Sequence, residues 1–442
     1  MSAAPGRSQT GSHGGAKHEG TPMGGRAGRP RIPAAALAVL LGGVSGSLHL
    51  GKLPPAVPAL QASLGIDLVE AGFLLSLVQV ASMTLGLVVG LAADTIGLRR
   101  SMLTGLIVLT VASLLGGAAG TGLGGGGAHA VHWLLVLRAV EGIGFLLAVM
   151  PGPGLIRALT PPGADKAALG LWGAYMPLGV ALALLLGPAL IGWGGWVDWW
   201  WALSAVSASA ALWLWIAVPA DRLRPSAAGP ASGGWASWLR ATAGARAPWL
   251  VALTFAVYSS QWIAVIGFLP AIYAGAGVPA AWSAVLTALA AAANIVGNVA
   301  GGRWLQRGVA PERLLQLGFL TMALSGVAAF AQMGQGAEAA GLPPTVRYIA
   351  VCAFSLGGGM VPATLFMLGV RLAPGPSTVS TTIGLMQQAS SLGQFLAPLA
   401  VAWLAHRVGG WQWTWTATLA CSLVGMAVAR RLGRIRPAAE MA

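Results

Sequence analysis

The amino-acid sequence predicts an all-α membrane protein whose twelve transmembrane helices form two six-helix bundles. Three observations predict this fold: the composition, the recurrence of long apolar stretches, and a polar interruption that divides those stretches evenly. Of the 442 residues, 56% are hydrophobic and 8% are charged, and the mean hydropathy is +0.75. A soluble protein of this size needs more charge to cover its surface, whereas lipid tails accept apolar side chains directly.

Apolar stretches of membrane-spanning length recur along the chain, and a helix needs about 20 apolar residues to cross the hydrocarbon core. In the first half, spans are expected at 33–57, 69–92, 101–121, 131–155, 167–191 and 199–219. In the second half, they are expected at 248–272, 281–304, 312–332, 345–370, 379–404 and 411–430.

The longest polar interruption, 220–247, divides the spans into six and six and is expected to be a cytoplasmic linker. The bundles are then expected at 32–219 and 248–432, with a cytoplasmic tail at 433–442. Residues 1–31 are rich in Gly, Ser and Arg and have no apolar core. We therefore expect a disordered basic cytoplasmic tail there and no cleavable signal peptide.

The distribution of Lys and Arg predicts the orientation in the membrane. With the N-terminus inside, the cytoplasmic segments collect most of the basic residues, and the external loops keep only Arg347 and Arg407. The formal charge of +14 and the pI of about 11.4 therefore follow from topology, and nucleic acid is not an expected partner. We expect a monomer in a bacterial inner membrane with both termini cytoplasmic.

Sequence motifs for other classes of activity are absent. Cys352 and Cys421 lie in apolar stretches and have neither metal-ligand nor disulfide spacing. No phosphate-binding Gly-Lys-Ser/Thr loop occurs, and the run from Gly124 to Gly127 lacks the strand context of a nucleotide-binding turn. Nothing resembles a nucleophile–base pair, so we expect no enzyme activity, no cofactor and no metal.

A charged loop follows the second span and reads GLAADTIGLRR from Gly90 to Arg100. Gly90 permits the close approach of another helix, and Asp94 can cap the N-terminus of a neighbouring helix or pair with a cation. Arg99 and Arg100 hold the loop on the cytoplasmic side. With Gly97, these residues are candidate gating residues; the alternative is an ordinary charged turn.

A degenerate second copy of this loop follows the eighth span and reads GRWLQRG from Gly302 to Gly308. Gln306 stands where the first copy has Asp, and Arg307 follows it. Recurrence at the matching place in both halves indicates an internal duplication. Gly302, Gln306 and Arg307 are therefore further candidate gating residues.

The fourth span contains two charged residues, Arg138 and Glu141, in the segment RAVEGIG. A charge inside the membrane is costly unless it is paired or faces water, so Arg138 is a candidate functional residue. The alternative is a structural Arg–Glu pair that stabilises the bundle.

Together, the two loops and the fourth span resemble the major facilitator superfamily. The first loop is similar to its signature Gly-x-x-x-Asp-Arg-x-Gly, with Thr95 in place of Arg. The fourth span is similar to its pattern Arg-x-x-Gln-Gly-x-Gly, with Glu141 in place of Gln. More weakly, segments 49–55, 170–177 and 384–388 resemble bacterial cyanate and nitroimidazole transporters. The resemblance implies a secondary transporter that works by alternating access.

Polar residues of the first and fourth spans are expected to lie together. Ser45, His49 and Lys52 share one helix face at spacings i, i+4 and i+7. Span four runs the other way, so Arg138 and Glu141 reach a similar depth, and the resemblance implies that both spans line a central cavity. Our hypothesis is an anion- or carboxylate-attracting wall in which His49 or Glu141 exchanges protons. The alternative is that Lys52 snorkels to the outer interface.

The C-terminal half carries neutral hydrogen-bonding side chains within its spans. The candidates are Tyr258, Gln261, Trp262, Asn294, Asn298, Gln387, Ser391 and Gln394. From the other half, Trp172 and Tyr175 lie in the resembling segment of span five and complete the expected substrate and proton pathway. The alternative is that some of these residues only bind neighbouring helices together.

The sequence thus predicts a secondary active transporter that moves a small solute. Its expected partners are that solute, protons and the lipid bilayer. We expect a small or organic anion, coupled to protons through His49 or Glu141. A proton-coupled multidrug-type exporter is the alternative, because Gly187 and Pro188 partly match an element of many antiporters in the family. A non-transporting membrane sensor is the alternative of another class.

Overall fold

The computed structural model of the chain describes residues 32–66, 68–121, 128–161, 164–221, 234–333 and 340–435. The described residues do not include the expected tail at 1–31, the glycine run from Gly124 to Gly127, the part of the expected linker from 222 to 233, or the end of the chain from 436.

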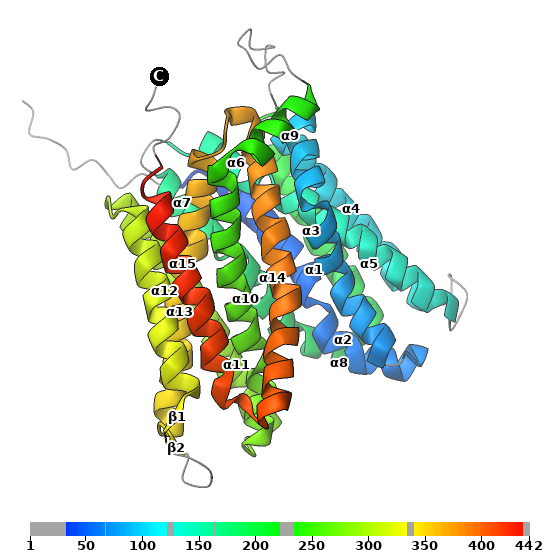
Figure 1. Cartoon of the computed structure of the whole chain (residues 1–442). Helices are drawn as coiled ribbons and strands as arrows, with labels where there is room; N and C mark the ends of the chain where they lie inside the picture. The colour runs from blue at the N-terminus through cyan, green and yellow to red at the C-terminus, as the bar shows by residue number, and fades with distance from the viewer. Residues whose placement is uncertain are drawn as a thin grey trace, which may run out of the picture. The chain divides into compact units, whose positions relative to one another are not determined.

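The first half of the described chain is entirely helical between its turns (Figure 1). Its helices are α1 (Ala34–Gly51), α2 (Leu53–Leu64), α3 (Leu68–Ile96), α4 (Leu98–Gly120), α5 (Ala128–Val149), α6 (Gly152–Leu159), α7 (Asp165–Trp172) and α8 (Tyr175–Ala217). Helices α1 with α2, α5 with α6, and α7 with the first part of α8 each form one interrupted crossing.

The second half begins with a short helix, α9 (Trp235–Gly244), inside the expected linker. The long helices are α10 (Arg246–Gly275), α11 (Ala280–Gln306), α12 (Pro311–Phe330), α13 (Pro344–Arg371), α14 (Val379–Val408) and α15 (Thr414–Leu432). Minor elements are the two-stranded hairpin β1 (Gln332–Met333) and β2 (Ala340–Gly341), and the 3-10 turns η2 (Pro376–Thr378) and η3 (Trp411–Trp413). The sequence did not anticipate α9 or the hairpin.

Twelve membrane crossings follow from these helices. Among the described residues, nine helical stretches are long and apolar enough to cross a membrane. One of them, Asp165–Ala217, is 53 residues long and breaks at Gly195, whose φ of 81° is outside the helical region, so it makes two crossings. The more polar α14 and α15 supply the remaining two. The predicted fold class is therefore confirmed, whereas the predicted domain limits stay a prediction.

The first crossing is interrupted because of its sequence. Pro54 and Pro55 have no backbone N–H, so the carbonyl groups of Leu50 and Gly51 lose their helical hydrogen-bond donors. Helix α1 ends at Gly51 and α2 begins at Leu53, which leaves Lys52 at the break. A buried carbonyl without a donor is costly in a membrane, so another group must supply that donor.

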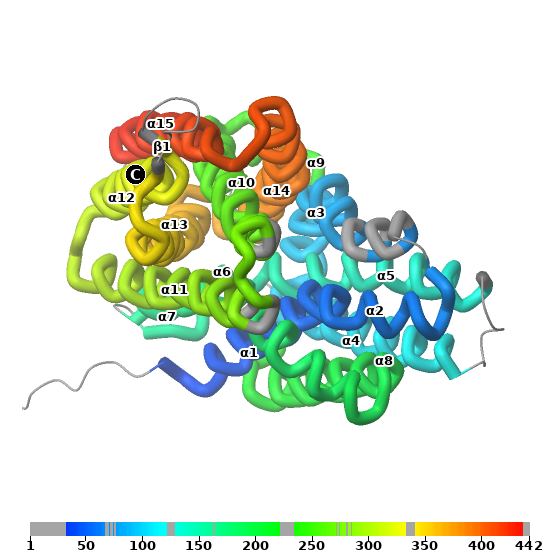
Figure 2. The backbone as a smooth tube through the Cα atoms, turned by 90° about the horizontal axis from the view of Figure 1, so that it is seen from below, coloured from blue at the N-terminus to red at the C-terminus, as the bar shows by residue number. Residues whose placement is uncertain are grey.

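The two halves pack against each other mainly through two helix pairs, α3 with α14 and α7 with α11. Figure 2 shows the halves side by side along the helix axes. Glycines line both crossings: a Cβ on Gly90 would collide with the Ser380 carbonyl, and a Cβ on Gly170 would collide with Gly302. Both pairs meet toward the end that carries α9, which is the upper end in Figure 1.

Candidate functional site

A cluster of charged side chains is buried inside the N-terminal half. It contains the five predicted residues Ser45, His49, Lys52, Arg138 and Glu141, and each is at most 3% exposed. They come from α1, from the α1–α2 break and from α5. The sequence prediction that these residues lie together agrees with the observed geometry, while their roles stay a prediction.

The carboxylate of Glu141 is the centre of this cluster. Its Oε1 accepts from Lys52 Nζ, and its Oε2 accepts from Arg138 Nη1 at 2.7 Å. His49 Nδ1 lies 3.6 Å from Oε1. Three nitrogen-bearing side chains thus surround one carboxylate, which is the arrangement that a charge requires in a low-dielectric interior.

Arg138 donates to two backbone carbonyl groups just before the break in the first crossing, and one of them, that of Leu50, has lost its helical donor. Its Nη1 donates to the His49 carbonyl at 2.6 Å, and its Nη2 approaches the Leu50 carbonyl at 3.5 Å. Its Nε also donates to the Leu74 carbonyl of α3 at 3.2 Å. The planar guanidinium therefore holds the break, the neighbouring helix α3 and the carboxylate in one geometry.

Lys52 is fully buried, so the snorkelling alternative is wrong. Besides Glu141, its ammonium donates to Ser113 Oγ of α4 at 3.2 Å and lies 4.5 Å from the centroid of the Trp200 ring. The Lys52 carbonyl accepts from Trp199 Nε1 at 3.0 Å. Every one of these partners belongs to the N-terminal half, so Lys52 is enclosed within that half in this conformation.

His49 continues the cluster toward two serines. Its Nε2 lies 2.7 Å from Ser207 Oγ of α8, and Ser207 Oγ lies 2.9 Å from Ser45 Oγ. The other ring nitrogen, Nδ1, has no hydrogen-bond partner although it is buried. Imidazole and hydroxyl groups can each donate and accept, so this chain of atoms is able to pass protons.

The polar residues predicted in the C-terminal half form separate small networks. Asn294 Nδ2 donates to Tyr258 Oη at 3.0 Å and to the Ser355 carbonyl at 3.0 Å. Trp262 Nε1 donates to Ser355 Oγ at 3.1 Å. Ser422 Oγ donates to Gln261 Oε1 at 3.0 Å, which directs Gln261 toward α15. These contacts bind helices of one half together.

Three other predicted residues face the N-terminal half. Asn298 Oδ1 packs against Gly173, and the Asn298 side chain donates to the Asn294 carbonyl at 3.0 Å. Gln394 Oε1 accepts from Gln79 Nε2 at 3.1 Å, and Ser391 Oγ lies 3.4 Å from Gln79 Oε1. A polar contact between α3 and α14 therefore lies within the membrane part of the protein.

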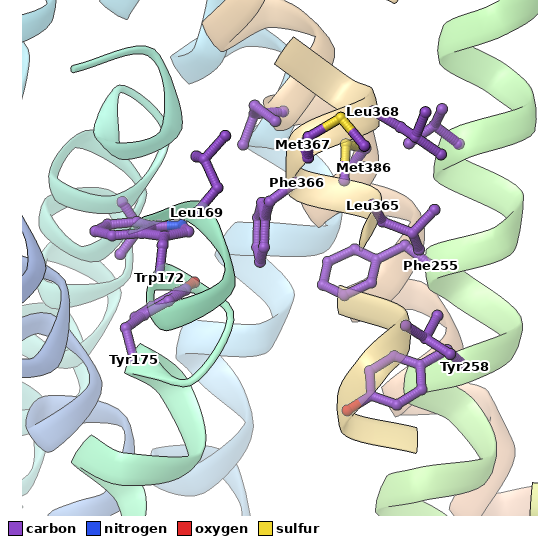
Figure 3. Close-up of a cluster of buried hydrophobic side chains, with 14 of the residues drawn as sticks. Leu169, Trp172, Tyr175, Phe255, Tyr258, Leu365, Phe366, Met367, Leu368 and Met386 are labelled. Atoms are coloured by element: carbon purple, nitrogen blue, oxygen red, sulfur yellow. The ribbon is translucent and has the colours of Figure 1, made fainter. Parts of the chain in front are cut away.

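An aromatic chain connects the two halves (Figure 3). Trp172 stacks on Tyr175 with centroids 4.5 Å apart, and Tyr175 lies 6.3 Å from Phe366 of α13. Phe366 meets Phe255 edge-on at 5.6 Å, and Phe255 stacks on Tyr258 at 6.1 Å. Among the described residues, the ring pair that crosses the interface is thus Tyr175 with Phe366. Gln387, another predicted residue, is buried on α14, where it follows the buried Met386.

The predicted gating residue Asp94 caps α14 across the interface. Its carboxylate accepts from the backbone N of Ser380 at 3.0 Å and from the backbone N and Oγ1 of Thr381 at 2.6 and 2.7 Å. The negative charge also suits the positive end of the helix dipole. Of the two possibilities that the sequence left open, a helix cap is the one observed.

At the other end of the same turn, Arg157 of α6 donates to the Val370 carbonyl of α13 at 3.1 Å. Both helix ends that flank the α13–α14 turn are therefore held by the N-terminal half. A cavity of about 560 Å³ lies beside these contacts.

Asp221 organises the rest of the first loop. It accepts from the backbone N of Arg99 at 3.0 Å and from that of Arg100 at 2.9 Å, so it caps α4. Gly97 has a φ of 109°, and a Cβ there would collide with Asp221. In the second loop copy, Gly302 packs against Gly170, whereas Gln306 and Arg307 are exposed at the end of α11.

Sequence reasoning missed several residues that complete these contacts, among them Ser113, Ser207, Asp221 and Gln79. Ser207 and Gln79 offered a sequence signal inside an apolar span, because Ser204 and Ser207 are three residues apart and so are Ser76, Gln79 and Ser82. Among the described residues, no group of three His, Cys, Asp or Glu side chains could hold a metal ion.

The fold and these contacts define a multi-pass membrane protein of the transporter class, built from two packed six-helix halves. Residues 35–398 match the Major Facilitator Superfamily, which is most of the chain. The chain belongs to this family. The predicted resemblance to the superfamily is therefore confirmed.

Solved transporter structures share the fold. The fucose:proton symporter FucP of E. coli superposes with a TM-score of 0.71 at 17% identity, covering 91% of this chain and 98% of that one. The proton:xylose symporter XylE superposes with a TM-score of 0.70 at 14% identity, covering 90% and 94%.

Two curated relatives match over shorter segments. Human solute carrier family 2, facilitated glucose transporter member 10, is 29% identical over 167 residues, which is 37% of this chain and 29% of the relative. The puromycin resistance protein pur8 of Streptomyces alboniger is 33% identical over 177 residues, which is 39% and 31%. The matched segments span about a third of each relative's length.

Proposed function

We propose that the protein is a proton-coupled secondary active transporter in which Glu141 binds the coupled proton. The observation that carries this proposal is a buried carboxylate between Lys52, Arg138 and His49. Protonation of Glu141 would release both cations from their counter-charge and rearrange α1 against α5. A titratable group with such partners inside a membrane is a typical proton site in pumps and transporters.

For the solute, we propose a small or organic anion. The cluster carries two cationic side chains against one carboxylate, so it has a surplus of positive charge. When Glu141 takes up a proton, this surplus grows, and electrostatic forces reach far in a low-dielectric interior. Proton uptake would therefore attract an anion to the space between the halves. The proton and the anion would then cross the membrane in the same direction.

Uptake into proteoliposomes tests both parts. The panel contains cyanate and acetate as small anions, L-fucose, D-xylose and D-glucose as neutral sugars, and puromycin. We expect gradient-driven accumulation of an anion by the wild type. Glu141→Gln should lose accumulation but keep exchange at equal concentrations, whereas Glu312→Gln at the start of α12 should behave as the wild type. Normal accumulation by Glu141→Gln would refute the proton site.

The anion itself is tested by Lys52→Ala and Arg138→Ala. If both variants accumulate the anion normally, the cationic cluster does not select the solute. Uptake of sugar but of no anion would also remove the anion proposal while leaving proton coupling intact.

A second candidate function is proton-coupled export of an apolar drug-like compound. It is supported by the aromatic chain between the halves and by the segment similar to the puromycin resistance protein. Aromatic faces bind apolar and planar solutes. Inside-out vesicles that concentrate puromycin when acidified inside would favour this candidate, and a lack of any puromycin movement would dismiss it.

The proposed setting is a bacterial inner membrane, with the α9 end in the cytoplasm and the protein acting as a monomer. The ends of α6, α11, α13 and α15 that lie on this side carry Arg157, Arg303, Arg371 and Arg430. Such a bias of basic residues marks the cytoplasmic side. Protease accessibility of a tag after the last residue, in right-side-out against inverted vesicles, tests the orientation.

A further inference from the structure

Two nitrogens face the same carboxylate oxygen in the buried cluster. Lys52 Nζ bonds Glu141 Oε1, while His49 Nδ1 lies 3.6 Å from that oxygen and has no hydrogen-bond partner. A separation of 3.6 Å is too long for a hydrogen bond. Arg138 meanwhile fixes the other oxygen, Oε2, at 2.7 Å. Lys52 therefore occupies the position through which His49 would exchange a proton with Glu141.

The second ring nitrogen of His49, Nε2, already has a hydrogen-bond partner. Nε2 lies 2.7 Å from Ser207 Oγ, which lies 2.9 Å from Ser45 Oγ. Ser45 precedes His49 by one turn of α1, so the chain of groups runs along α1 toward its N-terminal end. A path from Glu141 to Ser45 is thus complete except for one step.

Lys52 is placed where it can move independently of His49. His49 belongs to α1, whereas Lys52 stands at the break before α2, followed by Pro54 and Pro55. Prolines weaken the hydrogen bonds across such a break and make it a natural place for bending. Bending α2 against α1 would carry the Lys52 ammonium away from Oε1 while His49 keeps its place.

We propose that Lys52 gates a proton relay from Glu141 through His49 and Ser207 to Ser45. This rests on the proposed function, in which Glu141 carries the coupled proton. Lys52 is a positioning residue: it blocks the relay while it holds Oε1 and opens it when α2 bends. Conformational change in the first crossing is thereby linked to proton release.

The proton balance of the relay is simple. The O–H bond of protonated Glu141 breaks and an N–H bond forms at Nδ1 of His49. The proton on Nε2 leaves to Ser207 Oγ, the Ser207 hydroxyl proton passes to Ser45, and the Ser45 proton passes to water. The charged groups that face His49 are Glu141, Lys52 and Arg138, and α8 offers it only a hydroxyl.

The proton itself is the probe for this relay. Full-length protein in liposomes is given a rapid pH jump, and the carboxyl infrared band is followed in time, with Glu141→Gln assigning the band. We expect His49→Gln and Ser207→Ala to slow protonation of Glu141 at least tenfold without changing the final amplitude. Lys52→Met should accelerate it, because the competing ammonium is gone.

Matched controls separate the relay from general damage to the fold. His129→Gln alters an exposed histidine on α5, and Ser209→Ala removes an exposed serine hydroxyl on α8, so both should keep the wild-type rate. Ser207→Thr should restore the rate, since it keeps the hydroxyl.

Failure of the relay differs from failure of the proposed function. A Glu141 band that titrates at the wild-type rate in both His49→Gln and Ser207→Ala overturns the relay alone. A wild-type protein with no Glu141 band over the whole pH range of folding overturns the proton site and the relay with it.

Discussion

Asp94 of the N-terminal half accepts two hydrogen bonds from Thr381 of the C-terminal half, one from the backbone N at 2.6 Å and one from Oγ1 at 2.7 Å. This contact joins α3 to the first turn of α14 at the end that carries α9. It depends on Gly90, whose missing side chain lets the two helices approach. The charged loop that follows α3 in one half therefore contacts the N-terminus of α14 in the other half.

Removing the Asp94 carboxylate should open this end of the protein. Loss of a helix cap costs about 0.5–2 kcal/mol, so Asp94→Ala should shift the conformational equilibrium by roughly 2- to 30-fold. Spin labels at Ile96→Cys and Arg303→Cys, with Cys352 and Cys421 replaced by Ser, report the separation of the halves. Thr95→Ala, which removes a hydroxyl on the exposed side of the same turn, is the control. An unchanged distance distribution in Asp94→Ala would contradict the cap.

A side chain at Gly170 should force α7 and α11 apart. Overpacking of a tight contact costs about 1–3 kcal/mol, and Gly302 has no side chain that could move aside. Gly170→Val should therefore favour the state in which the α9 end is separated, seen with the same spin labels. Gly267→Val on α10 has open space around its Cβ and should leave the distances as they are.

Arg138→Lys should destabilise the protein although the charge is kept. A lysine cannot serve the Glu141 carboxylate and the His49, Leu50 and Leu74 carbonyls together, and each buried unsatisfied acceptor costs about 1–3 kcal/mol. Thermal unfolding in detergent measures the loss. Arg407→Lys, whose guanidinium lies over the Trp403 ring at an exposed site, should change the midpoint little. A midpoint for Arg138→Lys equal to the wild type would argue against this role.

Asp221→Asn should loosen the start of α4. The carboxylate caps two backbone N–H groups there, and exchanging it for an amide removes the charge and one acceptor oxygen, a loss of about 0.5–2 kcal/mol. Hydrogen–deuterium exchange should rise at Arg99 and Arg100 and stay unchanged along α12. Asp198→Asn, at an exposed position on α8, serves as the control.

The sequence was sufficient for the fold and for the charged cluster, and the reasons are physical. Apolar length identifies crossings because lipid excludes polar backbone, and helical spacing places Ser45, His49 and Lys52 on one face. Antiparallel direction then brings Arg138 and Glu141 to the same depth. These are local rules that need no knowledge of tertiary packing.

The remaining contacts depend on helix rotation, which local rules do not give. Whether Lys52 snorkels or is buried depends on Ser113 and Trp200, which belong to other helices. Asp221 lies far from Arg99 along the chain, and Gln79 lies far along the chain from its partner Gln394. Such partners are set by how the helices turn toward one another, so the sequence does not identify which residues pair.

The α13–α14 turn is held at both ends by opposite charges from the same half, Asp94 at the start of α14 and Arg157 at the end of α13. Both contacts act on one short turn, so the loss of one weakens the other. We therefore expect the two contacts to break together when this end opens. A transporter benefits from such behaviour, because an end that closes completely before the other opens prevents solute and protons from leaking across the membrane.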